Sequence, residues 1–354
     1  MVWENGRSNS AVGTGDNYRT SARLTLTSVQ VAISDLEAQL AAPRRDTTSV
    51  WPTGFVPFDE VIGGGIRESA LMLLAGNPGV GKTTLALQMA RNLAQSGRAA
   101  AIYLCFEHET SDLLARLIAM EGSLADDGVL TPLSLRDVRR ICAAQPERRP
   151  ASPATGAVDP RFTTALGRLQ VYRDRLFLCA ASTRATTLEA IELVVREVQE
   201  MSSVPVVLFV DYLQKVQPVR PRDTGDAATV TEALKDLALR RRLGVVAVSA
   251  LTEDGLRTSN TQLHHLLGGP ILAYESDVIV MLQEKFTRIA RVGFEYSPQR
   301  LNGIRDWVIA SIAKNRFGRD PVNLEFQKRF AFACFSPIGN PVSDALIDDK
   351  VYRE

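Results

Sequence analysis

Residues 76–84, GNPGVGKTT, combine glycines, a cation and hydroxyl side chains at the spacing of a phosphate-binding loop, G-x-x-x-x-G-K-[ST]. The glycines let backbone amides converge on a phosphate group, because side chains there would block the approach. The ammonium of Lys82 can reach the β- and γ-phosphates of ATP, and the hydroxyl of Thr83 can bind Mg²⁺. The predicted nucleotide-binding residues are Gly76, Asn77, Pro78, Gly79, Val80, Gly81, Lys82, Thr83 and Thr84.

Two acidic segments could complete a site that hydrolyses the nucleotide. The apolar run VVLFV ends in Asp211, where enzymes with this loop hold Mg²⁺ through a carboxylate. The run IYLCF is followed by Glu107 and Glu109, one of which could polarise the attacking water. Either could instead cap or solvate the next helix, expected to begin near Ser111, and we prefer that interpretation for Glu109. We therefore predict catalytic roles for Lys82, Glu107 and Asp211, with Thr83 and Asp211 as the metal ligands.

The segment KNRFG, residues 314–318, places the cations Lys314 and Arg316 at alternate positions. The flanking runs, residues 307–313 and 322–326, are typical of strands, so both side chains would point the same way near the tip or edge of a β-hairpin. Two cations on one side can neutralise charge that develops on a γ-phosphate. The alternative is a pair of solvated basic residues in a hairpin.

Five apolar runs are expected to supply the strands that position these residues. They are ALMLLA (70–75), AAAIYLCF (99–106), VPVVLFV (204–210), GVVAVSA (244–250) and SDVIVML (276–282). Their apolar residues do not alternate with polar ones, which is typical of strands buried on both faces of a parallel sheet. Helical patterns lie between them, among them residues 82–95, which Gly97 closes. We predict an α/β fold, with a mostly parallel sheet, helices on both faces and a C-terminal β-hairpin.

Composition limits the classes of partner and compartment. The 354 residues include 41 basic and 40 acidic side chains, so any nucleic-acid contact should be confined to a local loop or channel. The four cysteines are widely spaced and form no C-x-x-C pair, which argues against a zinc site and a disulfide framework and favours a reducing cytoplasm. No apolar run approaches the ~18 residues of a membrane span, so we expect no membrane anchoring.

The chain divides into three predicted parts. Residues 1–50 form an N-terminal arm and a linker helix, whose apolar stripe runs from Val29 to Leu40. Residues 51–336 form the nucleotide-binding domain, with a Pro- and Ala-rich surface insertion at residues 145–160. Residues 337–354 form a C-terminal tail.

Several of these motifs resemble known ATPase families. FEHETSDLLARL is similar to the segment that carries the catalytic glutamate of DnaB-type hexameric helicases, and VDYLQ is similar to their metal-binding strand. VIGGGI (61–66), LTEDG (251–255), LGGPILAYESD (267–277) and KNRFG resemble the related RadA branch. The resemblance covers residues 51–335. It implies a RecA-like P-loop ATPase core that works as a homo-hexamer or other ring, with ATP and Mg²⁺ bound between subunits and Lys314 and Arg316 acting in trans.

The resemblance also implies where DNA would bind. In RecA-like rings, loops after the third and fourth core strands face the pore and hold single-stranded DNA, and the matching loops here are residues 215–228 and 252–270. Basic side chains would meet phosphates and glycine amides would add contacts. The candidate residues are Lys215, Arg220, Arg222, Arg257, Gly268 and Gly269. Their alternative interpretation is a set of solvated, flexible loop residues.

Departures from the family patterns keep two functions open. Ala250 follows Ser249 where DnaB-type enzymes carry a polar sensor, and LLGGP replaces the arginine and glutamate of their pore loop. We predict a ring-forming ATPase motor on single-stranded DNA, a helicase or translocase in replication or recombination, with an unidentified protein loader or partner. The alternative is a RecA-fold regulatory ATPase that controls a protein partner and moves no DNA.

Overall fold

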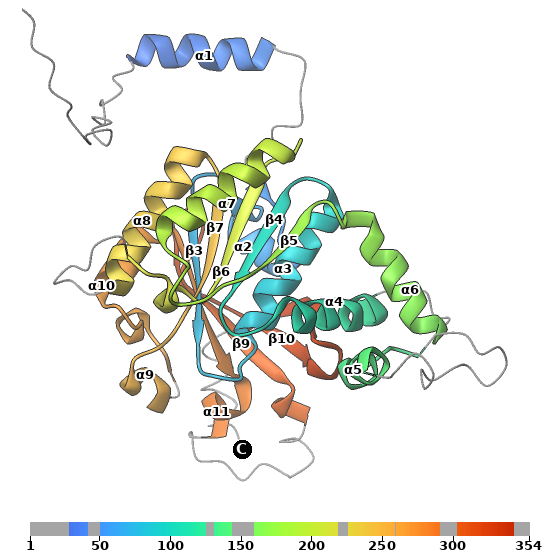
Figure 1. Cartoon of the computed structure of the whole chain (residues 1–354). Coiled ribbons are helices and arrows are strands. Elements are labelled where there is room, and N and C mark those ends of the chain that lie inside the picture. The colour runs from blue at the N-terminus through green and yellow to red at the C-terminus, as the bar shows by residue number, and fades with distance from the viewer. Residues whose placement is uncertain are drawn as a thin grey trace, which may run out of the picture. The chain divides into compact units, whose positions relative to one another are not determined.

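The computed structural model describes residues 28–41, 50–124, 131–143, 159–218, 226–258, 260–290 and 303–342. The chain forms two compact units, Met1–Thr48 and Ser49–Glu354. In the first unit the structure describes helix α1 (Val29–Ala41), on which Val29, Val31 and Ile33 are exposed (Figure 1). No helix among the described residues combines the length and apolar character that a bilayer span needs.

The second unit is built on a nine-stranded sheet, in the order β11-β10-β9-β8-β3-β7-β6-β4-β5 (Figure 1). The strands from β8 to β5 in this order run parallel, and β9, β10 and β11 are antiparallel to their neighbours. The parallel strands are β3 (Leu71–Gly76), β4 (Ala100–Cys105), β5 (Leu176–Ala180), β6 (Val206–Asp211), β7 (Gly244–Ser249) and β8 (Val278–Glu284). The antiparallel strands are β9 (Trp307–Asn315), β10 (Val322–Arg329) and β11 (Cys334–Val342). The predicted α/β fold is confirmed, including the β9–β10 hairpin.

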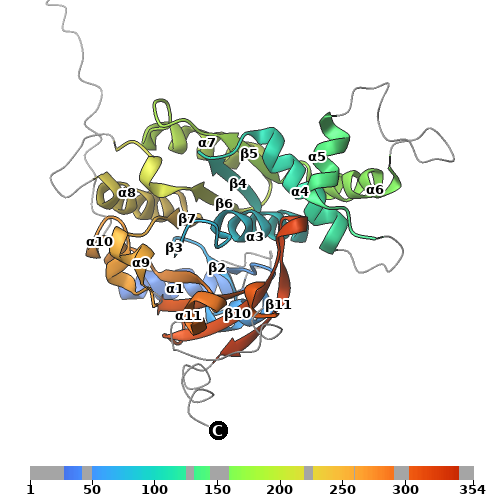
Figure 2. The ribbon, with the colours of Figure 1, turned by 90° about the horizontal axis from the view of Figure 1, so that it is seen from below.

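Helices cover both faces of this sheet. Alternate residues of β3 enter two separate cores, with Met72 and Leu74 in one and Leu71 and Leu73 in the other. Figure 2 shows α7 and α8 on one side of the parallel strands and α3 on the other. The first face carries α3 (Lys82–Ser96), α4 (Thr110–Leu124), α5 (Leu135–Ala143) and α6 (Pro160–Leu169), and the second carries α7 (Leu188–Met201), α8 (Asp226–Arg241) and α10 (Pro270–Glu275). Every residue of β3, β4, β6 and β7 is buried, so these strands are apolar except at the last residues of β6 and β7, Asp211 and Ser249.

Local signals set the helix ends. Helix α3 ends at Gly97, whose φ of 72° is left-handed and therefore favours glycine. The side chain of Thr187 caps α7 by accepting a hydrogen bond from Ala190 N at 3.3 Å. The remaining strands and α-helices of the described residues are β1 (Val50–Trp51), α2 (Val56–Val61), β2 (Ile66–Arg67), α9 (Glu253–Arg257) and α11 (Lys285–Ala290).

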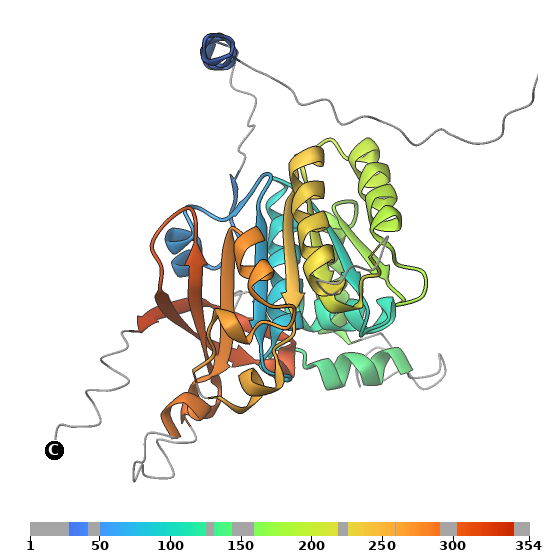
Figure 3. The ribbon, with the colours of Figure 1, turned by 90° about the vertical axis from the view of Figure 1, so that its left-hand side faces the viewer.

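The last strand, β11, was not predicted. It pairs with β10 as far as Val342. Residues 339–342, which the sequence analysis placed in a C-terminal tail beginning at residue 337, therefore belong to this sheet. The buried side chain of Gln88 in α3 fixes its start, donating to Phe335 O at 3.0 Å and accepting from Phe335 N at 2.7 Å. Figure 3 shows the orange and red C-terminal strands at one end of the sheet, to the left of the yellow α8. Residues 144–158, most of the predicted insertion, lie outside the described residues.

Candidate active site

The predicted nucleotide loop joins β3 to α3 and borders a cavity of about 490 Å³. Side chains from four strand ends meet there because the carboxyl ends of neighbouring parallel strands share one edge of the sheet. Of the predicted residues, Gly76, Pro78, Gly79, Gly81, Lys82, Thr83, Thr84, Glu107 and Asp211 line this cavity. Asn77 and Val80 belong to the loop without lining the cavity, and the side chain of Val80 is buried.

Two glycines are required by close packing. A Cβ on Gly76 would lie 2.3 Å from Leu282 O on the neighbouring strand. A Cβ on Gly81 would lie 2.6 Å from the rings of Phe330 and Phe335, and its φ of 103° is left-handed. The loop packs closely against β8, the β10–β11 connection and β11, and this packing leaves no room for a side chain at Gly76 or Gly81.

Lys82 lies inside this loop, where its Nζ donates to Gly76 O at 2.8 Å and to Asn77 O at 3.0 Å. Burial lowers the pKa of its ammonium, and the negative charges of Asp211 and Glu107 oppose that change. The ammonium thus lies between backbone carbonyls and two carboxylates, a position from which it can meet a phosphate.

Asp211 closes β6, and 1% of its surface is exposed. The Tyr103 hydroxyl lies 3.0 Å from Asp211 Oδ2 and 3.2 Å from Thr83 O, and the side chain of Thr83 hydrogen-bonds to the Asp211 carboxylate. Burial raises the pKa of Asp211 and the charge of Glu107 adds to the rise, whereas the hydrogen bonds from Thr83 and Tyr103 oppose it. A cation beside this carboxylate would favour its charged form.

This donor set fits magnesium better than a metal held by protein alone. Among the described residues, no group of three or more His, Cys, Asp or Glu side chains could hold a metal ion. Mg²⁺ commonly uses one or two protein oxygens together with waters and phosphate oxygens. The contacting oxygens of Thr83 and Asp211 match that pattern.

The two candidate glutamates occupy different places. Glu107 lines the cavity two residues past the end of β4 and near Asp211, because Cys105 pairs with Asp211 across the two strands. Glu109 is exposed and its carbonyl accepts from Asp112 N and Leu113 N, both at 3.1 Å, at the start of α4. The geometry therefore favours Glu107 as the residue near a nucleotide and Glu109 as a helix-start residue.

Sequence reasoning missed a charged cluster at the cavity wall. His108 and Arg116 line the cavity, and Asp112 bridges them, with its Oδ2 3.2 Å from His108 Nδ1 and 2.8 Å from Arg116 Nε. Arg139 adds a third contact at 2.5 Å from Asp112 Oδ1. Burial would raise the pKa of Asp112, but the hydrogen bonds and charges of Arg116 and Arg139 outweigh it and lower the pKa. The spacing of four between Asp112 and Arg116 in α4, with His108 a further four residues before it, was the available signal.

Apolar side chains line the rest of the cavity. Tyr212 follows β6, Leu256 comes from α9, and Phe330 comes from the β10–β11 connection. The Phe330 side chain is 37% exposed and packs edge-on against Phe335. No local sequence motif predicts a role for Phe330, because only the order of the strands in the sheet brings it beside the nucleotide loop.

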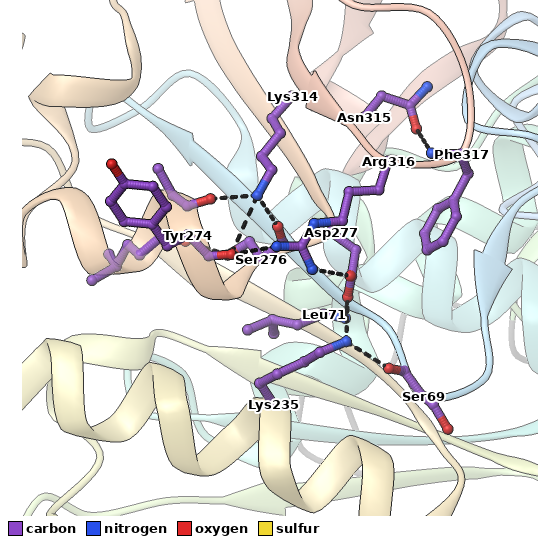
Figure 4. A network of polar contacts seen from close by, with 12 residues as sticks. Ser69, Leu71, Lys235, Tyr274, Ser276, Asp277, Lys314, Asn315, Arg316 and Phe317 are labelled. Atoms are coloured by element: carbon purple, nitrogen blue, oxygen red, sulfur yellow. Dashed lines mark hydrogen bonds and ion pairs between the residues drawn. The ribbon is translucent and has the colours of Figure 1, made fainter.

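Lys314 and Arg316 contact the C-terminal end of α10, as Figure 4 shows. The Nζ of Lys314 donates to Ala273 O at 2.6 Å and Ser276 O at 2.7 Å. Arg316 donates to Tyr274 O at 2.7 Å and to the Asp277 carboxylate at 3.0 Å. Burial lowers the pKa of Lys314 and the charge of Arg316 lowers it further. Both side chains therefore point to one face, and carbonyls at a helix C-terminus attract cations there.

Asp277 is the centre of this network. Its side chain is 6% exposed and accepts from Leu71 N at 2.8 Å, from Lys235 Nζ at 2.7 Å and from Arg316. Asp277 directly precedes β8, whereas Leu282, near the other end of β8, pairs with Gly76 of the nucleotide loop. Asp277 and Leu282 are five residues apart along the strand, so at about 3.3 Å per residue the distance between them is roughly 17 Å. Lys314 and Arg316 thus lie near the amino ends of the parallel strands, whereas the nucleotide loop of their own chain lies at the carboxyl ends.

The predicted DNA-binding residues are only partly brought together. Lys215 follows β6, with its ammonium 5.2 Å from the Tyr212 ring, and Gly268 and Gly269 precede α10 at the same edge of the sheet. Arg257 ends α9 and forms an ion pair with Glu253. Arg220 and Arg222 lie outside the described residues.

Comparison with known proteins gives consistent matches. A family model described as "DnaB-like helicase C terminal domain" matches residues 51–333. The DNA repair protein RadA of Mycobacterium tuberculosis (strain H37Rv) is 28% identical over 230 residues, covering 64% of this chain and 36% of that protein. The replicative DNA helicase DnaB of Treponema pallidum (strain Nichols) is 28% identical over 291 residues, covering 80% of this chain and 56% of that protein. The chain thus spans between about a third and little more than half of the length of these relatives.

Solved structures agree on the fold. One solved ATPase domain superimposes with a TM-score of 0.65 at 18% identity, over 88% of this chain and 99% of that domain. A DnaB-like replicative helicase, studied with its interactions with primase, gives a TM-score of 0.66 at 20% identity over 87% of this chain and 67% of that one. These superpositions show a shared fold.

Proposed function

We propose that this chain, which belongs to the DnaB-like helicase C-terminal domain family, hydrolyses ATP and uses it to move along single-stranded DNA as a subunit of a ring. One observation carries the proposal: Lys82, Thr83, Asp211 and Glu107 border a single cavity at the carboxyl edge of the sheet. These side chains supply the cation, metal ligands and carboxylate that phosphoryl transfer to water requires.

Each side chain has a defined task in this proposal. Lys82 holds the β- and γ-phosphates, and Thr83 and Asp211 hold Mg²⁺, which would neutralise phosphate charge when bound. Glu107 orients the attacking water and takes its proton, because it is exposed to the cavity beside Asp211. Phe330 offers an aromatic face to the nucleoside.

The separation between Lys314 or Arg316 and their own nucleotide loop supports the proposed ring. The roughly 17 Å between the two edges of the sheet is longer than either side chain, so these cations can meet a γ-phosphate only on another subunit. A head-to-tail contact between copies, repeated around a closed ring, would give every nucleotide such a partner. We therefore propose a homo-hexamer or a similar ring.

Single-stranded DNA is the polymer along which we propose that the ring moves. Lys215 and the loop Leu267–Gly269 lie together at the carboxyl edge, where they could meet backbone phosphates through one ammonium and backbone amides. With a formal net charge of +1, the chain offers little general attraction to polyanions, so binding should depend on these local contacts. Replication or recombination is the proposed setting.

DNA-dependent hydrolysis tests the proposal directly. ATP turnover is measured with and without single-stranded oligonucleotide, and binding of a labelled oligonucleotide is followed by fluorescence anisotropy at several salt concentrations. We expect stimulation, and we expect Lys215→Ala to reduce the salt slope by about one unit. The variant Lys82→Ala, which removes the phosphate contact, is the control without turnover. Absence of both binding and stimulation in an assembled, ATP-loaded sample would refute DNA movement.

A regulatory ATPase is the second candidate. It is favoured by Arg257, which is paired with Glu253 on its own helix, and by Ala250, which has no polar group to offer at the end of β7. Hydrolysis that is unaffected by DNA but changed by a protein partner would favour this function.

A further inference from the structure

The side chain of Gln214, in the short turn after β6, bonds to two neighbouring segments. Its amide nitrogen donates to Ser249 Oγ and to Leu267 O, each at 2.9 Å. Its carbonyl oxygen accepts from Ala250 N at 3.1 Å. One amide thus connects the turn behind Asp211, the end of β7 and the start of the loop Leu267–Gly269.

The orientation of this amide is determined by its partners. A backbone carbonyl such as Leu267 O can only accept, and a backbone N–H such as that of Ala250 can only donate. Turning the amide over would place oxygen against oxygen and nitrogen against nitrogen. The Gln214 side chain therefore fits its site in one orientation.

The segments joined by Gln214 belong to two different proposed sites. Ser249 and Ala250 line the nucleotide cavity, whereas Leu267 precedes the glycines proposed to meet DNA. Leu267 is also tied to β7 through its own N–H, which donates to Ala250 O at 3.0 Å. The start of the loop is thus held by one backbone bond and one side-chain bond, and the side-chain bond comes from the turn that follows the strand carrying Asp211.

We infer that Gln214 is a positioning residue that makes the placement of the loop Leu267–Gly269 depend on the nucleotide in the cavity. Contact of a nucleotide with Ser249 or Ala250 shifts the partners of the Gln214 amide, and the amide passes that shift to Leu267 O. A side chain at position 250 cannot do this, because alanine has no polar group. The inference rests on the proposed function of the cavity as an ATP site.

Hydrogen–deuterium exchange of residues 260–269, with and without a non-hydrolysable ATP analogue, measures this dependence. The full chain is compared with Gln214→Ala and with Gln214→Glu, which loses both donors and places a charged oxygen against Leu267 O. Gln217→Glu, an exposed position in the same segment, is the matched control. Binding of a fluorescent ATP analogue is measured on every variant.

We expect the analogue to change exchange in the wild type and in the Gln217 variant. In both Gln214 variants the change should shrink about two- to tenfold, the range for loss of the single hydrogen bond to Leu267 O, while the variants stay folded and still bind the analogue. An unchanged response in the Gln214 variants, or no response in the wild type despite bound analogue, overturns the inference. Failure to bind the analogue at all would instead refute the ATP site, and DNA stimulation is scored separately.

Discussion

Replacing Arg316 with alanine should stop catalysis without unfolding the chain. The Arg316 side chain is 48% exposed, and its loss leaves Asp277 bound to Lys235 and Leu71 N. A half-exposed ion pair contributes about 1 kcal/mol or less, so the free energy of unfolding should change little. The catalytic loss should be far larger, because a cation supplied to a transferring phosphoryl group is worth about 10³-fold or more in kcat.

Mixing two inactive variants shows which subunit receives the cation. In rings assembled from equal amounts of Arg316→Ala and Lys82→Ala chains, about half of the interfaces receive an intact nucleotide loop and about half of those also receive an intact Arg316. About a quarter of the wild-type activity should therefore return. If Arg316 served its own nucleotide, every site would lack one group and none would recover.

The assay is steady-state ATP turnover, with co-assembly verified by pull-down of a tagged variant. Arg319→Ala, an exposed arginine in the same hairpin connection, is the matched control and should remain active. Mixed assemblies that form but stay inactive would refute action across the interface. Full activity of Arg316→Ala alone would refute any catalytic role.

Three further predictions concern the carboxylates and the nucleotide loop. Glu107→Gln should retain ATP binding and slow single-turnover hydrolysis by about 10²- to 10⁴-fold, whereas Glu109→Gln should stay near the wild-type rate; equal losses would contradict the assignment. Asp59 is a buried residue of α2, and burial raises its pKa to about 6, so the folded state holds a proton that the unfolded chain releases near 3.8. The contribution of Asp59 to the free energy of unfolding should therefore fall by up to about 3 kcal/mol as pH rises between these values, and Asp59→Asn should remove that part of the slope in urea titrations. Gly81→Ala should lower the free energy of unfolding by about 1–3 kcal/mol, because the new methyl group would clash with two phenylalanine rings. Gly79→Ala shares the positive φ but meets nothing within 4 Å, so it should cost less, and equal losses would implicate backbone strain alone.

The parallel sheet could be predicted from the sequence because strands buried on both faces have continuous apolar runs. Strands such as β3 and β6 are covered by helices on each side, so every position is buried and the apolar run is easy to recognise. Strand β5, LFLCA, is apolar throughout but was missed because it is only five residues long, and the pattern of so short an apolar run does not distinguish a strand from a piece of helix. The nucleotide loop was recognisable because its residues are consecutive.

Groups that meet across long sequence separations were not predictable. Asp277 bonds to Leu71 N, 206 residues away, and the Phe330 ring reaches Gly81 from another strand connection. The chemistry of each residue alone is ordinary, and only the order of strands in the sheet brings them together. The partners of Gln214 were hidden for the same reason, since β6 and β7 become neighbours only after folding.

Strand β11 has a practical consequence for choosing where to cut this chain. The family match ends at residue 333, immediately before β11 begins, so an expression fragment designed on that match would omit the strand. Such a fragment would leave the buried amide of Gln88 without its partner and would uncover the hydrogen-bonding edge of β10, inviting intermolecular strand pairing and precipitation. A fragment intended for crystallisation or enzymology should therefore extend at least to Val342.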